Sequence, residues 1–261
     1  MYTVVAFHGS AVGTTETTLT PVPDEHIVYY ADSIRVPELN QLLGLLVFGS
    51  SVDHVRLESP SLRAEWLEDV DVFLEGDSLP QVQSVNEGGT STYRIEPHYA
   101  FRDYGGSPLV LTAGERLSVK AAARSGTSAV TAVLFFGDGV PAPVAGRIRT
   151  IKASTSVSGD AGAWATSTIT LGQFLPVGTY DLVGVKVVGT NVLAARMLFV
   201  GQAWRPGVLA VPTESIMPPQ KFAVGNMGVL GTFTNETIPQ LELLGYGSFT
   251  NPTVYLSIIK R

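Results

Sequence analysis

Residues 42–56, LLGLLVFGSSVDHVR, return in looser form at residues 182–196, LVGVKVVGTNVLAAR. When the first stretch is shifted by 140 residues, six of its 15 positions match without a gap. The matches include two glycines and the closing arginine, Arg56 or Arg196, which a shared preference for apolar residues does not explain. The physical interpretation of each copy is a strand, a tight turn and a second strand.

Glycine opens the turn in both copies, as Gly49 and as Gly189, and we expect positive φ there because glycine adopts it without steric cost. Polar residues follow in both turns, as they do in most tight turns. A tryptophan comes after each copy, Trp66 after the first and Trp204 after the second, within two residues of the same offset. This agreement favours a shared role in the core.

A second, weaker similarity relates residues 115–136 to residues 237–258, with a shift of about 121 residues. Two similarities in the same order predict two copies of one domain, the second with a shorter middle, although β-rich chains also resemble one another by chance. The boundary is expected in residues 137–146, GDGVPAPVAG, because its prolines and glycines make a poor strand. We therefore predict a first domain over residues 1–140 and a second over residues 141–261.

The rest of the chain is typical of an all-β protein, because short runs of Val, Ile, Thr, Tyr and Phe alternate with Gly, Pro, Ser and Asn. Two segments, residues 36–43 and 238–244, are predicted as helical turns. The prediction is two tandem eight-stranded β-sandwiches with few short helices. The expected strands are 3–7, 26–30, 45–48, 70–74, 117–121, 131–136, 163–170, 180–188, 194–200 and 253–259.

Composition limits the function classes. Apolar residues make up 45% of the 261 residues and charged residues only 15%, so much of the surface is expected to be covered by partner subunits. The net charge is −6 and no basic stripe occurs, which argues against nucleic-acid binding. The absence of cysteine excludes disulfides. No signal peptide and no membrane-spanning helix are expected.

Catalytic and metal-binding patterns are weak, so we predict no enzyme, no cofactor and no metal or catalytic residue. The four histidines, His8, His26, His54 and His98, are not spaced as metal ligands. Asp24 and Glu25 next to His26 are a marginal metal candidate. The acidic stretch 65–77 places Asp69 and Asp71 on one strand face, where they fit a charged strand edge better than a Ca²⁺ site or a glycosidase pair.

The tandem repeat G-x-x-V-x-G-[ST]-x-V-x-x-x-R, and the continuation GQAWRPG at residues 201–207 of the second copy, resemble the double jelly-roll major capsid proteins of tailless icosahedral viruses and phages. The resemblance covers the whole chain at the level of pattern. It implies a homotrimer that serves as a pseudo-hexameric tile of an icosahedral shell in the virion, assembled in the host cytoplasm. The implied partners are further trimers, penton or minor capsid proteins and an internal lipid membrane.

Residues 75–114 of the first copy are a candidate trimer contact or outward tower, or else a loop that packs on its own domain. Aromatic residues and arginine, which are enriched at interfaces, gather there. They are Tyr93, His98, Tyr99, Phe101, Arg102 and Tyr104.

Two other functions remain open. A two-lobed carbohydrate-binding or host-attachment protein would use exposed aromatic residues, and Trp66, Trp164 and Trp204 are the candidates. A two-barrel cupin enzyme would need clustered histidine and glutamate ligands, and the four histidines are scattered.

Overall fold

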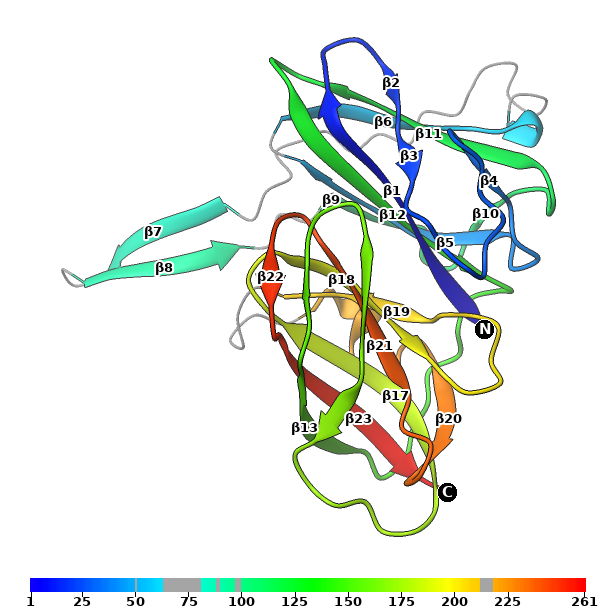
Figure 1. The fold of residues 1–261 in the computed structure, drawn as a ribbon, viewed down its shortest axis with the longest axis vertical. Helices are drawn as coiled ribbons and strands as arrows, with labels where there is room; N and C mark the ends of the chain where they lie inside the picture. Colours follow the sequence, from blue (N-terminus) through cyan, green and yellow to red (C-terminus); the bar gives the residue numbers. More distant parts are fainter. Residues whose placement is uncertain (50, 63–80, 88–89, 97–99, 212–217) are drawn as a thin grey trace.

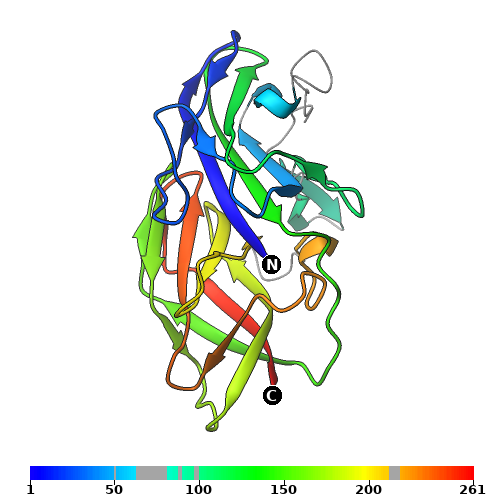
Figure 2. The same cartoon turned by 90° about the vertical axis from the view of Figure 1, so that its right-hand side faces the viewer.

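The chain folds into two β-sandwich lobes stacked along the long axis of the molecule (Figure 1), and a view turned by 90° shows the same stacking (Figure 2). The computed structural model describes residues 1–49, 51–62, 81–87, 90–96, 100–211 and 218–261. We call the strands within residues 2–137 the N-terminal lobe and those within residues 149–260 the C-terminal lobe. All sheet pairings between strands in both lobes are antiparallel.

The N-terminal lobe has one sheet in the order β10-β5-β12-β1-β3, with β9 also on β5, and one in the order β2-β11-β4, with β6 also on β11. The strands β7 and β8 form a separate two-stranded hairpin. The strands are β1 Tyr2–Val12, β2 Thr17–Thr18, β3 Thr20–Pro21, β4 Ile34–Arg35, β5 Gln41–Gly49, β6 Val52–Glu58, β7 Gln81–Glu87, β8 Thr90–Glu96, β9 Ala100–Asp103, β10 Leu109–Val110, β11 Arg116–Ala123 and β12 Ser128–Gly137.

The C-terminal lobe has one sheet in the order β16-β13-β23-β17-β20 and a second in the order β15-β21-β18-β19. A small pair, β14 and β22, completes it. The elements are β13 Arg149–Thr155, β14 Ser158–Gly159, β15 Trp164–Ser167, β16 Ile169–Leu171, β17 Thr179–Val188, β18 Val192–Leu198, β19 Gly207–Leu209, the 3-10 helix η1 Gln220–Phe222, β20 Gly231–Thr234, β21 Gln240–Gly245, β22 Phe249–Thr250 and β23 Thr253–Lys260.

The repeated stretch is the same structural unit in both lobes. Residues 42–56 form most of β5 and β6, and residues 182–196 form most of β17 and β18. In each lobe the first strand of this unit pairs with the last long strand, β12 or β23, which in turn pairs with the first, β1 or β13. The order of pairing is therefore the same in the two lobes.

A β-bulge also repeats. The pairing of β5 with β12 skips Leu43, and the pairing of β17 with β23 skips Val183, which is the residue 140 positions later. A bulge inserts one unpaired residue and increases the local twist. Its presence at equivalent positions indicates that the two strands follow the same path.

The sheet β10-β5-β12-β1-β3 separates two apolar cores. Along β1, Val5 and Phe7 point into the core of the N-terminal lobe, whereas Val4 and Ala6 belong to a cluster that continues through the C-terminal lobe. Strands β5 and β12 alternate in the same way, so they read as nearly continuous apolar runs rather than as an alternating pattern. Burial of both faces explains the run LLGLLVFG.

The turn glycines differ from the prediction. Neither Gly49 nor Gly189 has positive φ; in the second copy the left-handed residue is Asn191, with φ 64°. Glycine is needed for space instead. An added Cβ at Gly49 would lie 2.9 Å from the carbonyl oxygen of Ala129, and one at Gly189 would lie 2.7 Å from Cβ of Pro252.

Three local predictions are wrong. Residues 36–43 hold no helix and lead into β5, while residues 238–244 form most of β21. Residues 26–30 hold only one isolated bridge, at Tyr29, in place of a strand. Strand 70–74 lies outside the described residues. Among the residues that are described, no helix is long and apolar enough to cross a membrane.

Candidate functional site at the seam between the lobes

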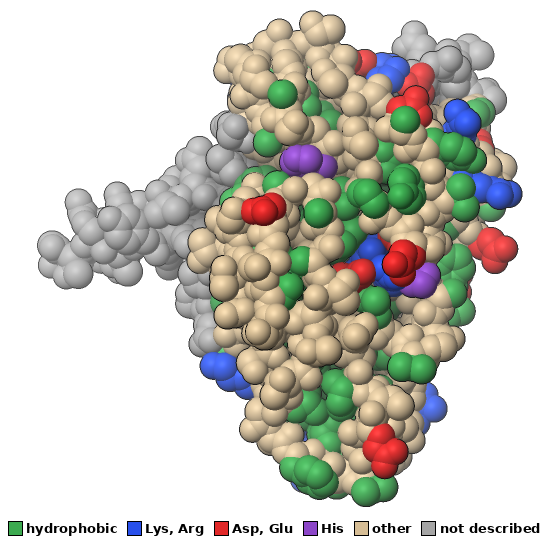
Figure 3. All heavy atoms as spheres, in the orientation of Figure 1, with side chains coloured by type: hydrophobic (Ala, Val, Ile, Leu, Met, Phe, Trp, Pro, Cys, Tyr) green, Lys and Arg blue, Asp and Glu red, His purple; other side chains and the backbone are tan. Residues whose placement is uncertain are grey.

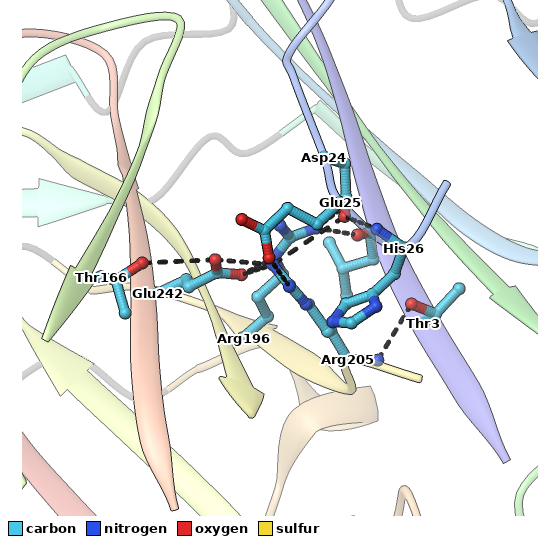
Figure 4. Close-up of polar contacts among 9 residues, drawn as sticks. Thr3, Asp24, Glu25, His26, Thr166, Arg196, Arg205 and Glu242 are labelled. Atoms are coloured by element: carbon cyan, nitrogen blue, oxygen red, sulfur yellow. Dashed lines mark hydrogen bonds and ion pairs between the residues drawn. The ribbon is translucent and has the colours of Figure 1, made fainter. Parts of the chain in front are cut away.

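A cluster of buried charges lies where the lobes meet (Figure 4). Its centre is Arg196 on β18, whose side chain is only 1% exposed. Arg196 Nε donates to Oε2 of Glu242 at 2.5 Å, and Arg196 Nη1 donates to the carbonyl oxygen of Val4 at 2.9 Å and to Asp24 Oδ2. The guanidinium also stacks on the ring of Trp164, 4.0 Å from its centroid. We call Asp24, Arg196, Arg205 and Glu242 the seam cluster.

Arg205 adds the second positive charge. Its Nη1 donates to both carboxylate oxygens of Glu242, at 2.6 and 2.7 Å, and lies 3.8 Å from Asp24 Oδ1. Its Nη2 lies 3.5 Å from Oε2 of Glu25, a side chain that is 90% exposed. Within the seam cluster the two positive charges of the arginines thus balance the two negative charges of the carboxylates. Glu25 adds one further negative charge at the surface.

The strand register positions these groups. Arg196 and Glu242 face each other across the β18–β21 pairing, and Trp164 lies on β15, the next strand beyond β21. Arg205 comes from the segment between β18 and β19, whereas Asp24 comes from the N-terminal lobe, between β3 and β4. The seam cluster therefore ties the two lobes together through charged side chains.

Main-chain and tyrosine contacts continue the seam. The Val4 N–H donates to the Arg205 carbonyl at 3.1 Å, and the Tyr2 hydroxyl donates to the Gly207 carbonyl at 2.8 Å. Burial raises the pKa of Tyr2, so its hydroxyl remains a donor. Elsewhere in the core that spans the seam, Phe101 and Phe222 pack around Phe135. The ring centroids of Phe101 and Phe135 are 5.9 Å apart.

Open clefts adjoin the seam cluster. One, of about 570 Å³, is lined by cluster members together with Glu25, Tyr29, Trp164 and Gln240. A second, of about 550 Å³, shares Tyr29 and Pro23 with it, and a third, of about 480 Å³, shares Arg205 and Gln240. We call these three adjoining clefts the seam groove. Figure 3 shows acidic, basic and histidine side chains gathered at mid-height on this face.

The histidines lie in different parts of the molecule. His8 lies in the second cleft, where its Nδ1 is 2.9 Å from Thr131 Oγ1, and burial lowers its pKa. His26 is on the rim of the third cleft, and its main-chain N–H donates to Asp24 Oδ1 at 2.9 Å. His54 lies between Asp53 and Glu16 on β6 of the N-terminal lobe, away from the other two. His98 lies outside the described residues.

The marginal metal candidate is an ion-pair site. Asp24 is held by Arg196, and Glu25 lies beside Arg205. Within the described parts of the chain, no three His, Asp or Glu side chains lie together as metal ligands. Asp69 and Asp71 lie outside those parts.

The aromatic candidates have mixed outcomes. Trp164 and Trp204 are partly buried, Trp164 against the core that spans the seam and Trp204 against the core of the N-terminal lobe. Within residues 75–114, β9 pairs with β5, and Phe101 on β9 packs against the core that spans the seam. Strand β9 therefore packs on its own chain. Trp66, His98 and Tyr99 lie outside the described residues, and a trimer contact stays a prediction.

Sequence reasoning missed the seam cluster. It identified Arg196 as a repeated residue and Arg205 as part of a motif, but without a partner for either. Glu242 lies in the run LELL, which the sequence predicts as a helical turn, and a helical turn would not place Glu242 opposite Arg196. A single carboxylate inside an otherwise apolar strand is itself a signal, because such a group is buried only when it is paired.

Comparison with known proteins adds little. No protein-family model matches the chain, and no curated protein matches it. Among solved structures, the chain is similar to the major capsid protein P2 from bacteriophage PM2, with 8% sequence identity and a TM-score of 0.24 over 100% of this chain and 98% of that chain.

Proposed function

We propose that this chain is a structural virion protein, a double jelly-roll capsid subunit whose jelly rolls are residues 1–140 and 141–261. The observation that supports the proposal is the strand order of the C-terminal lobe. When eight strands of this lobe are numbered 1 to 8 along the chain, the two sheets read 1-8-3-6 and 2-7-4-5, with β16 as an added edge strand beside strand 1. The eight strands are β13, β15, β17, β18, β19, β20, β21 and β23. This is the order of a jelly roll, an architecture used by capsid proteins, lectins and cupins.

The N-terminal lobe supports the same assignment. Its strands β1-β12-β5, with β9 or β10 beside β5, match the first order, and β2-β11-β6 matches three strands of the second. The repeated bulge at Leu43 and Val183 adds a match that does not depend on residue type. Both lobes are therefore consistent with one ancestral jelly roll.

A tile needs rigidity between its two halves, and the seam supplies it. One sheet contributes a face to each core, and the buried contacts of Arg196 with Asp24 and with the Val4 carbonyl oppose sliding of one lobe on the other. Such a subunit transmits force across a shell as one body. A capsid role assigns the work to shape and interfaces, without a catalytic residue or cofactor.

The proposed assembly is a homotrimer that packs with further trimers, and with penton or minor capsid proteins, into an icosahedral shell. Six similar jelly rolls in a trimer approximate a hexagon. The low proportion of charged residues, 15%, suits a subunit with large buried contacts.

Light scattering on the purified protein, before and after gentle heating, tests the assembly. We expect a species of three subunits that persists after heating, and electron microscopy of concentrated samples should show hexagonal tiles or shells. A monomer at every concentration would overturn the proposal. So would an experimental structure whose two lobes do not superpose.

A further inference from the structure

The seam groove has the chemistry of a binding site, independently of any shell. Its central cleft, of about 570 Å³, is within the usual size range of small-molecule pockets. Its lining combines carboxylates, a guanidinium, the amide of Gln240 and the hydroxyl of Thr166 with the rings of Tyr29 and Trp164. Tyr29 is 47% exposed, so its ring is available at the surface of the groove.

Hydrogen-bond donors in the walls lack acceptors. Arg205 is 96% buried as a side chain, and its Nε has no hydrogen-bond partner among the described residues; the same holds for Nε1 of Trp164. Buried donors are nearly always satisfied, by protein, water or ligand. The two orphaned donors belong to side chains that line the same cleft, and both lie just beneath its surface.

Charge selects against an anionic ligand. Asp24, Glu25 and Glu242 contribute three negative charges around the cleft, against two positive charges from Arg196 and Arg205. A ligand that both accepts from a guanidinium and donates to carboxylates, without a charge of its own, fits this lining. Neutral sugar hydroxyls do both, and the apolar face of a sugar ring packs on an aromatic side chain.

We propose that the seam groove binds a neutral saccharide, with a sugar ring against Tyr29 and hydroxyls facing Gln240 and the exposed side of the Arg205–Glu25 pair. The second cleft extends the site. It shares Tyr29 with the first and adds Ser10, Thr20 and Tyr30, so the groove accommodates more than one sugar unit. The ligand class is therefore a neutral oligosaccharide.

The position at the seam distinguishes this site from the aromatic candidates taken from the sequence. Trp164 is a wall of the cleft whose ring already contacts Arg196, so Tyr29 is the available stacking surface. The binding surface needs both lobes, because Tyr29 comes from the N-terminal lobe and Gln240 from β21 of the C-terminal lobe. Neither lobe alone presents it.

Saturation-transfer NMR on the full chain, in its purified assembly state, tests the proposal. The probes are the methyl glycosides of glucose, galactose, mannose and N-acetylglucosamine, and the corresponding disaccharides, each at millimolar concentration. We expect transfer to at least one glycoside, and a stronger response to its disaccharide. Tyr29→Ala and Gln240→Ala, both at exposed positions, should reduce the transfer at least tenfold.

Phe174→Ala is the matched control, because Phe174 is 84% exposed and does not line the three clefts of the groove. It should leave the transfer unchanged. Absence of transfer from every probe would overturn the proposal, and so would transfer that survives both groove substitutions. Light scattering on the same samples reports the assembly state, so loss of saccharide binding and failure of the capsid proposal are distinguishable.

Discussion

Arg56 and Arg196 occupy the same position of the repeated stretch, yet they have different surroundings. Arg56, on β6, is partly exposed, contacts the Glu16 carboxylate and faces Lys120 across the β6–β11 pairing. Arg196, on β18, is fully buried and faces Glu242 across the equivalent β18–β21 pairing. Strand pairing keeps the two positions equivalent, whereas the place of each sheet in the molecule determines whether the charge is solvated.

The difference shows how one fold can serve as a surface in one copy and as an interface in the other. The partner across the strand is a lysine where water is near and a carboxylate where it is not. A buried arginine needs paired carboxylates, because an uncompensated buried charge is strongly destabilising. A partly exposed pair such as Arg56 with Glu16 adds less, because water screens it.

The largest effect is expected from replacing the two arginines by methionine, which keeps the length of the side chain. Arg196→Met should lower the free energy of unfolding by about 3–5 kcal/mol, because Asp24 and Glu242 lose a buried partner. Arg56→Met should lower it by less than about 1 kcal/mol. Urea denaturation followed by circular dichroism measures both.

Arg196→Lys is a milder substitution that can be measured if the methionine variant does not fold. It keeps the charge but loses the planar fork that reaches both Glu242 and the Val4 carbonyl, so we expect a smaller loss than for methionine. Equal losses at positions 56 and 196 would contradict the contrast between the two lobes.

The turn glycines test where the two copies remain alike. Gly49→Ala and Gly189→Ala should each cost about 1–3 kcal/mol, because the new methyl group meets a neighbouring residue in both turns. Gly106→Ala is the control, since nothing lies within 4 Å of its added Cβ. Thermal melts measure all three, and a loss at only one of the two turns would show that the copies have diverged there as well.

The smallest effect concerns two histidines of the N-terminal lobe, one beside the seam and one away from it. A hydrogen bond with Asp53, aided by Glu16, raises the pKa of His54, whereas burial lowers that of His8. NMR titration should place the His54 midpoint above 6.5 and the His8 midpoint below it.

The two shifts have opposite consequences for stability. The His54 contribution is present below pH 6.5 and is lost as the pH rises through its folded pKa, whereas that of His8 is lost as the pH falls through its own. The His54 contribution is below about 1 kcal/mol, because water screens its partly exposed ion pairs. Glu16→Gln should lower the His54 midpoint only; a shift at His8 as well would contradict the separation of the two environments.

The sequence predicted the sandwich architecture because antiparallel strands joined by a tight turn have a recognisable local pattern. That pattern, a strand, a glycine turn and a second strand, occurs twice. It did not predict that β21 is a strand, because Leu241, Glu242 and Leu243 are buried on both faces and show no alternation. The missing period of two is a consequence of tertiary burial, which a local window does not contain.

The seam cluster was inaccessible to sequence reasoning for a related reason. Asp24 and Arg196 are separated by 172 residues, and their contact depends on how the lobes stack. No spacing rule links them. Tyr29 likewise gains its place in a groove only when the C-terminal lobe lies beside it.

The sheet with two buried faces has a consequence for synthesis of the chain. The N-terminal lobe leaves the ribosome first, with Val4, Leu46, Phe48 and Phe135 on a surface that stays uncovered until the C-terminal lobe has been translated and folded. During that interval the nascent chain exposes an apolar surface through which it can aggregate with other unfolded chains. A longer interval between synthesis of the two lobes would therefore favour aggregation of the unfinished chain.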